Sequence, residues 1–375
     1  MKIGIITFHN VTNYGAMLQA LASQENLKKF GYKAEIINYA PIDVTSIYQP
    51  FSLYKYKKWW KKSKTLALRS VASDTVYFRS INRKNQAFSD FGSRYYNLSE
   101  KSYKTKEEIK ADEPQYDVCF TGSDQVWNPD ITYGFDSTYF LDFGKENMVR
   151  ASYAASIGRD SYSEKEQNQL KELLKKFDSI SMREETAAEI IAPFSPVQPC
   201  VAIDPTLLLN AQDWKKLFNI SDEPKEEYIF VYTLMDNSEL NKYVEILSEK
   251  TGLPVVTFNR RKVYKNEKET FPTADPEKFV ELIANARYVV TNSFHGTAFS
   301  VNFSKDFVTF KSPTRNSRIT DFLGKLGIPE RAVAQSDEGL LELPQIDYSV
   351  VHEKLQKERD KANDYIKSVI EKAKK

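Results

Sequence analysis

The stretch Tyr288-Val-Val-Thr-Asn-Ser-Phe-His-Gly296 carries the clearest structural signal in the sequence. Tyr288–Thr291 is a short β-branched run, typical of a strand that is buried on both faces. Asn292 and Ser293 favour a turn or a helix cap, and Thr297–Phe303 is compatible with a helix. A strand that runs directly into a helix places the histidine of this stretch beside free backbone N–H groups. Such a turn is a ready anion site.

His295, with Asn292, Ser293 and Gly296 around it, is therefore a candidate to hold a phosphate or carboxylate, or to pass it a proton. The alternative that the local pattern leaves open is a capped strand–helix turn with an ordinary surface histidine.

Composition limits the function classes. A length of 375 residues predicts two or three domains, each with its own core. Lys+Arg 53 against Asp+Glu 51 leaves a net charge of +2, which argues against a polyanion-binding protein. Two cysteines, Cys119 and Cys200, fit reduced, buried thiols. No signal peptide and no apolar run of ~18 residues is present, so we expect a globular cytoplasmic protein.

The first 40 residues predict a βαβ unit, with strands at Ile3–Thr7 and Ala34–Asn38 and a helix at Ala16–Phe30. Ligands of such sheets sit at the carboxyl ends of the strands. The residues between the first strand and the helix are therefore candidate site residues, with a plain helix cap as the alternative: Asn13, Tyr14 and Gly15.

A second set of candidates follows the buried strand Tyr116–Thr121. Gly122 and Ser123 let the backbone turn after the strand, and Asp124 lies just beyond. Asp124 can serve as a base or bind a sugar hydroxyl, or it can simply cap the next turn. Further strands are predicted at Ser152–Ser156 and Ser179–Met182.

Arg183 stands at the end of the last of these strands, before a helix at Thr186–Ile191. A helix N-terminus disfavours positive charge unless an anion or a carboxylate compensates it. Arg183 is therefore a candidate anion ligand.

Four prolines in Pro193–Pro205 predict an interdomain connection. We therefore divide the chain into two Rossmann-like α/β domains facing across a cleft. These are 1–205, with an insertion at 41–113, and 206–345, with 346–375 as a helix that packs back. In the second domain, Lys311 ends a strand and Arg318 precedes a helix.

Residues 54–69 interleave aromatic and basic side chains. This pattern is typical of peripheral contact with a membrane surface or an anionic acceptor. Two alternatives are single-stranded nucleic acid, which we do not expect as a partner, and a solvated helix with Trp59 or Trp60 packed inward.

Several chemistries lack their sequence patterns. The histidines His9, His295 and His352 are widely separated, so no metal site is predicted. No Asp-x-Asp, G-x-G-x-x-G or phosphate-binding P-loop occurs, which argues against metal-dependent sugar-nucleotide transfer and against NAD or ATP chemistry.

Seven stretches, in this order and spacing, resemble the polysaccharide pyruvyl transferase family across residues 1–330: Asn13-Tyr-Gly15, Thr121-Gly-Ser-Asp-Gln-Val-Trp-Asn128, Tyr153-Ala-Ala-Ser-Ile-Gly158, Ser181-Met-Arg-Glu184, Ile203-Asp-Pro-Thr206, Thr291-Asn-Ser-Phe-His-Gly296 and Asn316-Ser-Arg-Ile319. The resemblance implies a glycosyltransferase-B-like fold. It also implies transfer of a pyruvyl group from phosphoenolpyruvate to two hydroxyls of a sugar or lipid-linked glycan, giving a cyclic ketal, with phosphoenolpyruvate as donor and no cofactor.

By this resemblance, His295 binds phosphate or donates a proton, Arg183 binds the carboxylate or phosphate, and Asp124 is a candidate base. Asn292, Ser293, Gly296, Lys311 and Arg318 would bind the donor. Asn13, Tyr14, Gly15, Gly122 and Ser123 would bind the acceptor. Ser293 stands where many relatives have an arginine, so another cation has to fill that role, or the donor differs. Two alternatives stay open: a nucleotide-sugar glycosyltransferase, and a non-catalytic relative that binds a glycan or an anion.

Overall fold

The computed structural model describes residues 1–221, 226–258, 263–311 and 317–374. The chain divides into two compact units. Unit 1 contains Met1–Leu208 and the segment from Lys361 onward, and unit 2 contains Leu209–Asp360.

The sheet of unit 1 is parallel throughout and has the strand order β3-β2-β1-β4-β5, the order of one Rossmann half and its continuation. Its strands are β1 (Ile3–Ile6), β2 (Ala34–Tyr39), β3 (Leu98–Tyr103), β4 (Val118–Thr121) and β5 (Val149–Ser152). Alternate residues face two separate cores, because side chains alternate along a strand: Ile5 and Phe120 enter one core, Ile6 and Cys119 the other.

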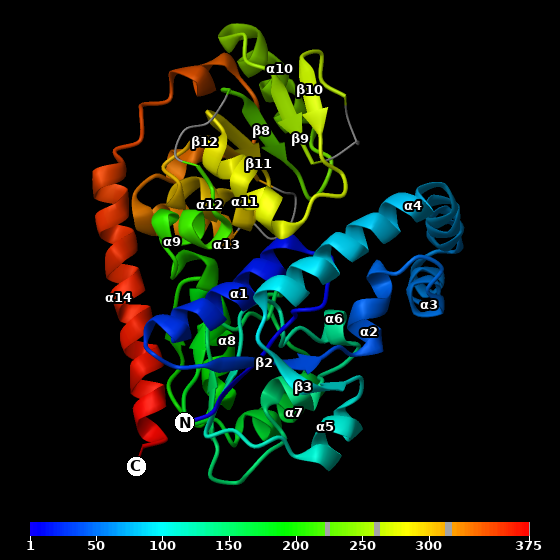
Figure 1. The fold of residues 1–375 in the computed structure, drawn as a ribbon, viewed down its shortest axis with the longest axis vertical. Coiled ribbons are helices and arrows are strands. Elements are labelled where there is room, and N and C mark those ends of the chain that lie inside the picture. The colour runs from blue at the N-terminus through cyan, green and yellow to red at the C-terminus, as the bar shows by residue number, and fades with distance from the viewer. Residues whose placement is uncertain (222–225, 259–262, 312–316, 375) are drawn as a thin grey trace. The chain divides into compact units, whose positions relative to one another are not determined.

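Helices cover both faces of this sheet (Figure 1). The core around Ile5 and Phe120 includes residues of α1 (Tyr14–Lys29) and of the second half of α14 (Tyr348–Lys372). The opposite core includes residues of α5 (Lys106–Asp112), α7 (Glu164–Leu174) and α8 (Glu185–Ile191).

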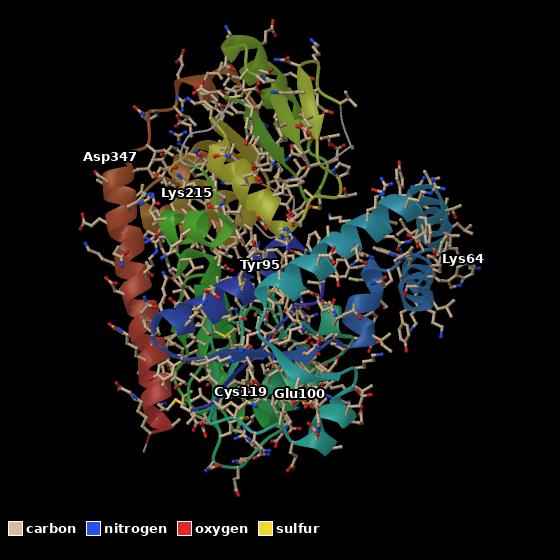
Figure 2. The ribbon with its side chains drawn as sticks, in the orientation of Figure 1. Lys64, Tyr95, Glu100, Cys119, Lys215 and Asp347 are labelled. Atoms are coloured by element: carbon tan, nitrogen blue, oxygen red, sulfur yellow. The ribbon has the colours of Figure 1, made fainter. Side chains whose placement is uncertain are left out.

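The predicted insertion 41–113 is too long, because β3 pairs with β2 and α5 packs into the core, so both belong to the sheet domain. The inserted part consists of α2 (Ile42–Thr45), η1 (Ser46–Tyr48), α3 (Leu53–Lys62) and α4 (Lys64–Tyr95). Figure 2 labels Lys64 and Tyr95, the two ends of α4.

Two further predictions for unit 1 are wrong. The predicted connection Pro193–Pro205 contains β7 (Cys200–Val201), which pairs with β6 (Ser181–Met182) and so belongs to unit 1. The strand predicted at Ser152–Ser156 ends at Ser152, because Ala154 has a φ of +49° and takes the chain out of the extended conformation.

Unit 2 repeats the parallel arrangement with the order β10-β9-β8-β11-β12-β13, the full Rossmann order. Its strands are β8 (Ile229–Tyr232), β9 (Val255–Thr257), β10 (Glu267–Thr270), β11 (Tyr288–Thr291), β12 (Asp306–Phe310) and β13 (Ala332–Val333). Its helices are α9 (Ala211–Phe218), α10 (Ser238–Thr251), α11 (Pro276–Asn285), α12 (Phe294–Asn302), α13 (Ser317–Leu326) and the first half of α14.

The remaining elements are single helical turns: α6 (Pro129–Thr132), η2 (Ser137–Phe140), η3 (Ala192–Phe194), η4 (Pro205–Leu207), η5 (Pro329–Arg331) and η6 (Glu338–Glu342). Across the part of the chain that the structure covers, no helix has both the length and the apolar composition of a membrane span. The predicted α/β class with two Rossmann-like sheets is confirmed. The predicted cleft between the two stays a prediction.

Candidate active site

The carboxyl ends of β1 and β4 lie where the strand order of unit 1 reverses, which is where open α/β sheets bind ligands. The backbone N–H of Gly122 donates to the carbonyl of Ile6 at 2.7 Å, and the Thr7 hydroxyl donates to the carbonyl of Ser123 at 2.9 Å. A Cβ atom on Gly122 would lie 3.0 Å from the Cβ of Thr7, so a side chain here would push the strand ends apart. Gly122 and the fully buried Ser123 thus join two strand ends.

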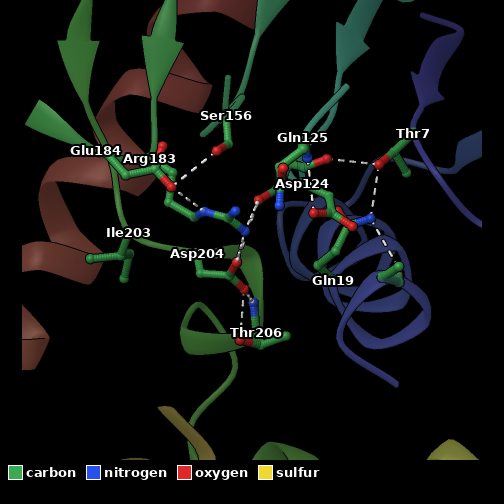
Figure 3. Close-up of polar contacts among 12 residues, drawn as sticks. Thr7, Gln19, Asp124, Gln125, Ser156, Arg183, Glu184, Ile203, Asp204 and Thr206 are labelled. Carbon is green, nitrogen blue, oxygen red and sulfur yellow. Dashed lines mark hydrogen bonds and ion pairs between the residues drawn. The ribbon is translucent and has the colours of Figure 1, made fainter. Parts of the chain in front are cut away.

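Arg183 lies directly after β6, and only 3% of its side chain is exposed. Its Nη1 donates to Oδ2 of Asp204 at 2.8 Å, and its Nε donates to Oε1 of Glu184 at 3.1 Å (Figure 3). The hydroxyl of Ser123 donates to the same Asp204 oxygen at 3.4 Å, and Thr206 donates its N–H and hydroxyl to Oδ1. Two carboxylates of the chain therefore compensate the guanidinium charge of Arg183. The sequence left open whether a ligand anion or a carboxylate of the chain compensates this charge.

Burial alone would lower the pKa of Arg183, because it disfavours the charged form. The negative charges of Glu184, Asp204 and Asp124 more than offset burial, so the pKa lies above its ordinary value. Arg183 therefore stays charged and cannot act as a general acid near neutral pH.

Several of the sequence stretches meet around this ion pair. The Ser156 hydroxyl donates to Oε1 of Glu184 at 3.0 Å, and the Tyr153 hydroxyl donates to the carbonyl of Ile203 at 3.0 Å. Residues that are far apart in the sequence thus form one buried polar network, and its bonds fix the loops at the carboxyl edge of the sheet.

Asp124 belongs to one of these loops. It has a φ of +70°, its carbonyl accepts from the Ser156 N–H at 3.0 Å, and its Oδ1 accepts from the Gln125 N–H at 2.9 Å. The side chain is half-buried and lies close enough to Arg183 for their charges to interact. Its use as a base stays a prediction.

Asn13, the N-cap of α1, and Tyr14 and Gly15, its first two residues, have different environments. The side-chain oxygen of Asn13 accepts from the first turn of the helix at 3.2 Å, so it is a helix cap. Tyr14 is buried, with its ring centroid 4.9 Å from that of Phe88 and 4.9 Å from Nζ of Lys84. Gly15 is buried in the same turn. Capping and packing account for these side chains, and acceptor contact by them stays a prediction.

The strand order of unit 2 reverses between β8 and β11, and Asn292 bridges these two strand ends. Its Oδ1 accepts from the N–H of Leu234 at 2.8 Å, and its Nδ2 donates to the carbonyl of Met235 at 2.9 Å. The amide of Asn292 is therefore engaged with backbone on both sides and shapes the loop after β8.

Ser293 is the N-cap of α12, and its hydroxyl accepts from the N–H of Gly296 at 3.4 Å. The helix consequently begins at Phe294, three residues earlier than predicted. A Cβ atom on Gly296 would lie 2.5 Å from Oγ1 of Thr291, so glycine allows the helix to start this close to the strand.

His295 lies in the first turn of α12 and is half-buried. The hydroxyls of Thr297 and Thr309 share a hydrogen bond of 2.8 Å, which ties α12 to β12. Since β11 and β12 are parallel, Lys311, directly after β12, ends at the same edge of the sheet as His295.

Arg318 comes from α13. The rings of Phe294 and Phe322 lie 5.7 Å apart, and Arg318 is one helical turn before Phe322 on the same face. The structure thus places a histidine and a lysine at one edge of the sheet of unit 2, at a helix N-terminus, an arrangement suited to an anion. Participation of Arg318 in this site stays a prediction.

Sequence reasoning missed the part that Glu184 and Asp204 have in the arginine network. Both residues lie within the stretches that resemble the family. A buried cation requires carboxylate partners, and this requirement could have identified Glu184 and Asp204 from the sequence. Among the residues described in both units, no group of three or more His, Cys, Asp or Glu side chains is placed to hold a metal ion.

Solved structures show the fold. A provisionally assigned UDP-N-acetylglucosamine 2-epimerase from Listeria monocytogenes is 10% identical, with a TM-score of 0.51, covering 94% of this chain and 90% of that chain. This likeness confirms the glycosyltransferase-B-like fold. UDP-GlcNAc 2-epimerase from Methanocaldococcus jannaschii is 14% identical, with a TM-score of 0.49, covering 95% and 92%. Heptosyltransferase WaaC of E. coli with ADP is 12% identical, with a TM-score of 0.40, covering 96% and 100%.

No curated protein sequence matches this chain. The family model for polysaccharide pyruvyl transferase matches residues 13–312, which include both the arginine network of unit 1 and the His295 turn of unit 2. The match covers well over half of the chain, so this protein belongs to the polysaccharide pyruvyl transferase family.

Proposed function

We propose that the protein transfers a pyruvyl group from phosphoenolpyruvate to two hydroxyls of a sugar in a cell-surface polysaccharide precursor. Membership of the family supports the transferase class, and the His295 turn is the observation that carries the donor assignment. Phosphoenolpyruvate bears a phosphate and a carboxylate, and fixed cations with N–H donors suit both groups.

In the proposed reaction, the methylene carbon of phosphoenolpyruvate takes a proton and becomes a methyl group. One sugar hydroxyl attacks the neighbouring carbon and a second hydroxyl displaces phosphate, which yields the cyclic ketal. The two hydroxyl protons balance the new C–H bond and the released hydrogen phosphate, so the reaction needs no cofactor. A positioned proton donor typically contributes ~10²–10⁴-fold to such a step.

We assign the donor to unit 2. His295 would bind phosphate and deliver the proton, with Lys311 and Arg318 on the same anion. Ser293 leaves this turn without a bidentate cation of its own, and the two neighbouring cations are the available replacements. Asn292 and Gly296 would act by shaping the turn, which their contacts with Leu234 and Thr291 support.

We assign the sugar acceptor to unit 1. The Arg183 network would keep Asp124 in place as the base that takes a hydroxyl proton. Because Arg183 is engaged with Glu184 and Asp204, its proposed effect on substrate is through the position of Asp124 and through its charge. Reaction in the cytoplasm fits phosphoenolpyruvate, which is a cytoplasmic metabolite.

A lipid-linked acceptor would bring the protein to a membrane surface, and the inserted helices offer a matching one. Residues 53–78, here called the arm, contain one acidic residue, Asp74, which is buried and accepts from Lys55 at 2.6 Å. The arm exposes large apolar side chains, namely Leu53, Tyr54, Trp60, Leu68, Val71, Val76, Tyr77 and Phe78. It also exposes basic ones, namely Lys57, Lys61, Lys64 and Arg69. Apolar and basic exposed groups together suit an anionic lipid surface.

The test is calorimetric titration of phosphoenolpyruvate into wild type, His295→Ala and His352→Ala, followed by phosphate release with sugar diols. We expect wild type and His352→Ala to bind, and His295→Ala to lose about tenfold or more in affinity, since a hydrogen bond to a charged group contributes ~1.5–3 kcal/mol. Equal binding by all three proteins would contradict the donor assignment. Binding of UDP- or GDP-sugar in place of phosphoenolpyruvate would favour glycosyl transfer, and binding without turnover a non-catalytic relative.

A further inference from the structure

Unit 1 contains a cavity of about 350 Å³ beside the carboxyl end of β1. Four segments line it: the loop after β1 at Asn10–Thr12, Met17 of α1, the turn at Thr45–Gln49, and one face of α4. The volume lies within the ~300–1,000 Å³ of small-molecule sites, and this edge of a parallel sheet is where such sites occur. None of the residues predicted from the sequence as acceptor ligands lines this cavity.

The lining is polar and carries no charged side chain. Its polar part includes three serine and threonine hydroxyls and five carboxamides, and the carboxamides come from the β1 loop, the 45–49 turn and α4: Asn10, Gln49, Asn82, Asn85 and Gln86. A carboxamide both donates and accepts hydrogen bonds, as a sugar hydroxyl does. No cation belongs to the lining itself, and Nζ of Lys84 lies over the ring of Phe88, 5.6 Å from its centroid. The chemistry of the lining therefore favours a neutral, hydroxyl-rich ligand over the donor substrate.

One face of α4 contributes four polar side chains to the cavity. Asn82, Asn85, Gln86 and Ser89 recur at the three- and four-residue spacing that places side chains on one side of a helix. Asn82 and Gln86 are exposed. The Gln86 amide donates to Oδ1 of Asp90 at 2.8 Å, so its carbonyl oxygen is the atom that would accept from a ligand hydroxyl.

Asn85 connects three of the segments that form the walls of the cavity. It accepts from the Thr12 hydroxyl at 2.7 Å, and its Nδ2 donates to the carbonyl of Tyr48 at 3.0 Å. One side chain thus joins the loop after β1 and the turn before α3 to α4, so the cavity does not depend on a ligand to form. Tyr48 and Phe88 add aromatic surface for the apolar face of a sugar ring.

Tyr48 also links the cavity to the candidate base. Burial raises the pKa of Tyr48 to about 12, and the negative charge of Asp124 adds to the shift. The carboxylate of Asp124 is therefore within electrostatic reach of a cavity wall.

We propose that this cavity binds a neutral sugar ring of the acceptor glycan, with Asn82 and Gln86 hydrogen-bonded to its hydroxyls. The inference rests on the proposed function for the role of the sugar as acceptor, while the binding itself rests on the cavity alone. Phe78 of the arm precedes Asn82 by one helical turn, about 6 Å along the axis, so one helix would serve both the sugar and its lipid carrier.

The experiment is saturation-transfer NMR on the full chain with neutral p-nitrophenyl hexosides and N-acetylhexosaminides, and with a p-nitrophenyl glucuronide as the charged counterpart. The proteins are wild type, the double variant Asn82→Ala/Gln86→Ala, and Arg83→Ala as a matched exposed control on the same helix. We expect wild type and Arg83→Ala to bind at least one neutral glycoside more tightly than the glucuronide. The double variant should lose fivefold or more in affinity.

Three results would overturn the proposal: no neutral glycoside binds wild type, the double variant binds as wild type does, or the glucuronide binds as well as the neutral glycosides. Phosphoenolpyruvate titration of the same samples separates this inference from the proposed function. Sugar binding without phosphoenolpyruvate binding would exclude pyruvyl transfer and leave the cavity assignment intact. Phosphoenolpyruvate binding without sugar binding would exclude only the cavity assignment.

Discussion

Arg183 and Asp204, 21 residues apart in the sequence, form an ion pair of 2.8 Å in which both side chains are almost completely buried. A buried pair of this kind contributes less than its Coulomb energy, because both groups lose their hydration. Removing one partner is costly, however, since the other charge stays buried. The pair is therefore a sensitive point for the stability of unit 1.

Asp204→Asn keeps the shape of the side chain and removes its charge, so Arg183 loses one of the carboxylates with which it forms ion pairs. We expect the free energy of unfolding of unit 1 to fall by up to about 3–5 kcal/mol. The measurement is the urea midpoint followed by circular dichroism. Lys357→Gln, which removes an exposed ion pair with Glu353, is the control and should leave the midpoint in place. Equal shifts of the urea midpoint in both variants would show that the buried ion pair contributes no more to stability than the exposed one.

Gly296→Ala places a methyl group where the hydroxyl oxygen of Thr291 lies 2.5 Å away. We expect a loss of roughly 1–3 kcal/mol in stability, because the first turn of α12 has to move. If His295 binds the donor, affinity for phosphoenolpyruvate should fall as well.

Gly324→Ala is the matched control, since nothing lies within 4 Å of its added Cβ atom on α13. It should stabilise the protein by about 0.5–1 kcal/mol, as glycine weakens a helix interior. A Gly296→Ala protein as stable as Gly324→Ala would refute the close approach of helix and strand.

Titration of Lys84 should make the stability of the folded state depend on pH. Burial lowers its pKa to about 8, whereas an unfolded lysine titrates near 10.4. Below pH 8 both states carry the proton and the folded state bears the full cost of the buried charge. Between pH 8 and 10.4 the folded state releases the proton first, so stability should rise with pH, by up to about 3 kcal/mol.

Urea midpoints at pH 7 to 10 would measure this effect. Lys84→Met should flatten the rise, while exposed Lys33→Met should keep the slope of wild type. The same slope in Lys84→Met and wild type would assign the pH dependence to other groups.

The exposed basic and apolar side chains of the arm predict that the protein binds anionic vesicles, and that this binding weakens as the salt concentration rises. Replacing Lys57, Lys61 and Lys64 by Gln should weaken it roughly a hundredfold, at ~1 kcal/mol for each charge near the surface. Flotation on phosphatidylserine vesicles is the measurement. Gln at Lys171, Lys175 and Lys176, exposed cations outside the arm, removes the same charge and should have little effect. Unchanged flotation of the arm variant would exclude the membrane role.

The best sequence predictions concern strands that are buried on both faces. Tyr288–Thr291 has the predicted bounds, because a β-branched run followed by two capping residues allows one interpretation. The start of α12 was placed three residues too late, since the capping bond from Gly296 to Ser293 is a contact that periodicity does not report.

Helix α4 shows what the sequence does not reveal. Leu68, Val71 and Phe78 are exposed, so the apolar residues of its first half do not mark a buried face. Its face over 82–89 lines a cavity whose other walls come from residues 10–12, Met17 and residues 45–49. The cavity depends on tertiary contacts, above all those of Asn85, and no local pattern predicts such contacts.

The same limit explains the site of unit 1. The sequence identified Arg183 as an unusual cation, whereas its pairing with Asp204 requires β6 and β7 to lie side by side. A sequence pattern can identify candidate residues at the end of a strand. The partners of those residues can be identified only when the order of the strands in the sheet is known.

Residues of α14 beyond Lys361 complete the core of the first Rossmann sheet, where Ile366, Val369 and Ile370 are buried. During synthesis the ribosome makes about 150 residues of unit 2 before this segment emerges, which takes roughly 8–30 s at ~5–20 residues per second. For that time the nascent first sheet has one apolar face incompletely covered. Chaperone contacts should therefore concentrate on the strands around Ile5 and Phe120, and they should end when the last helix arrives.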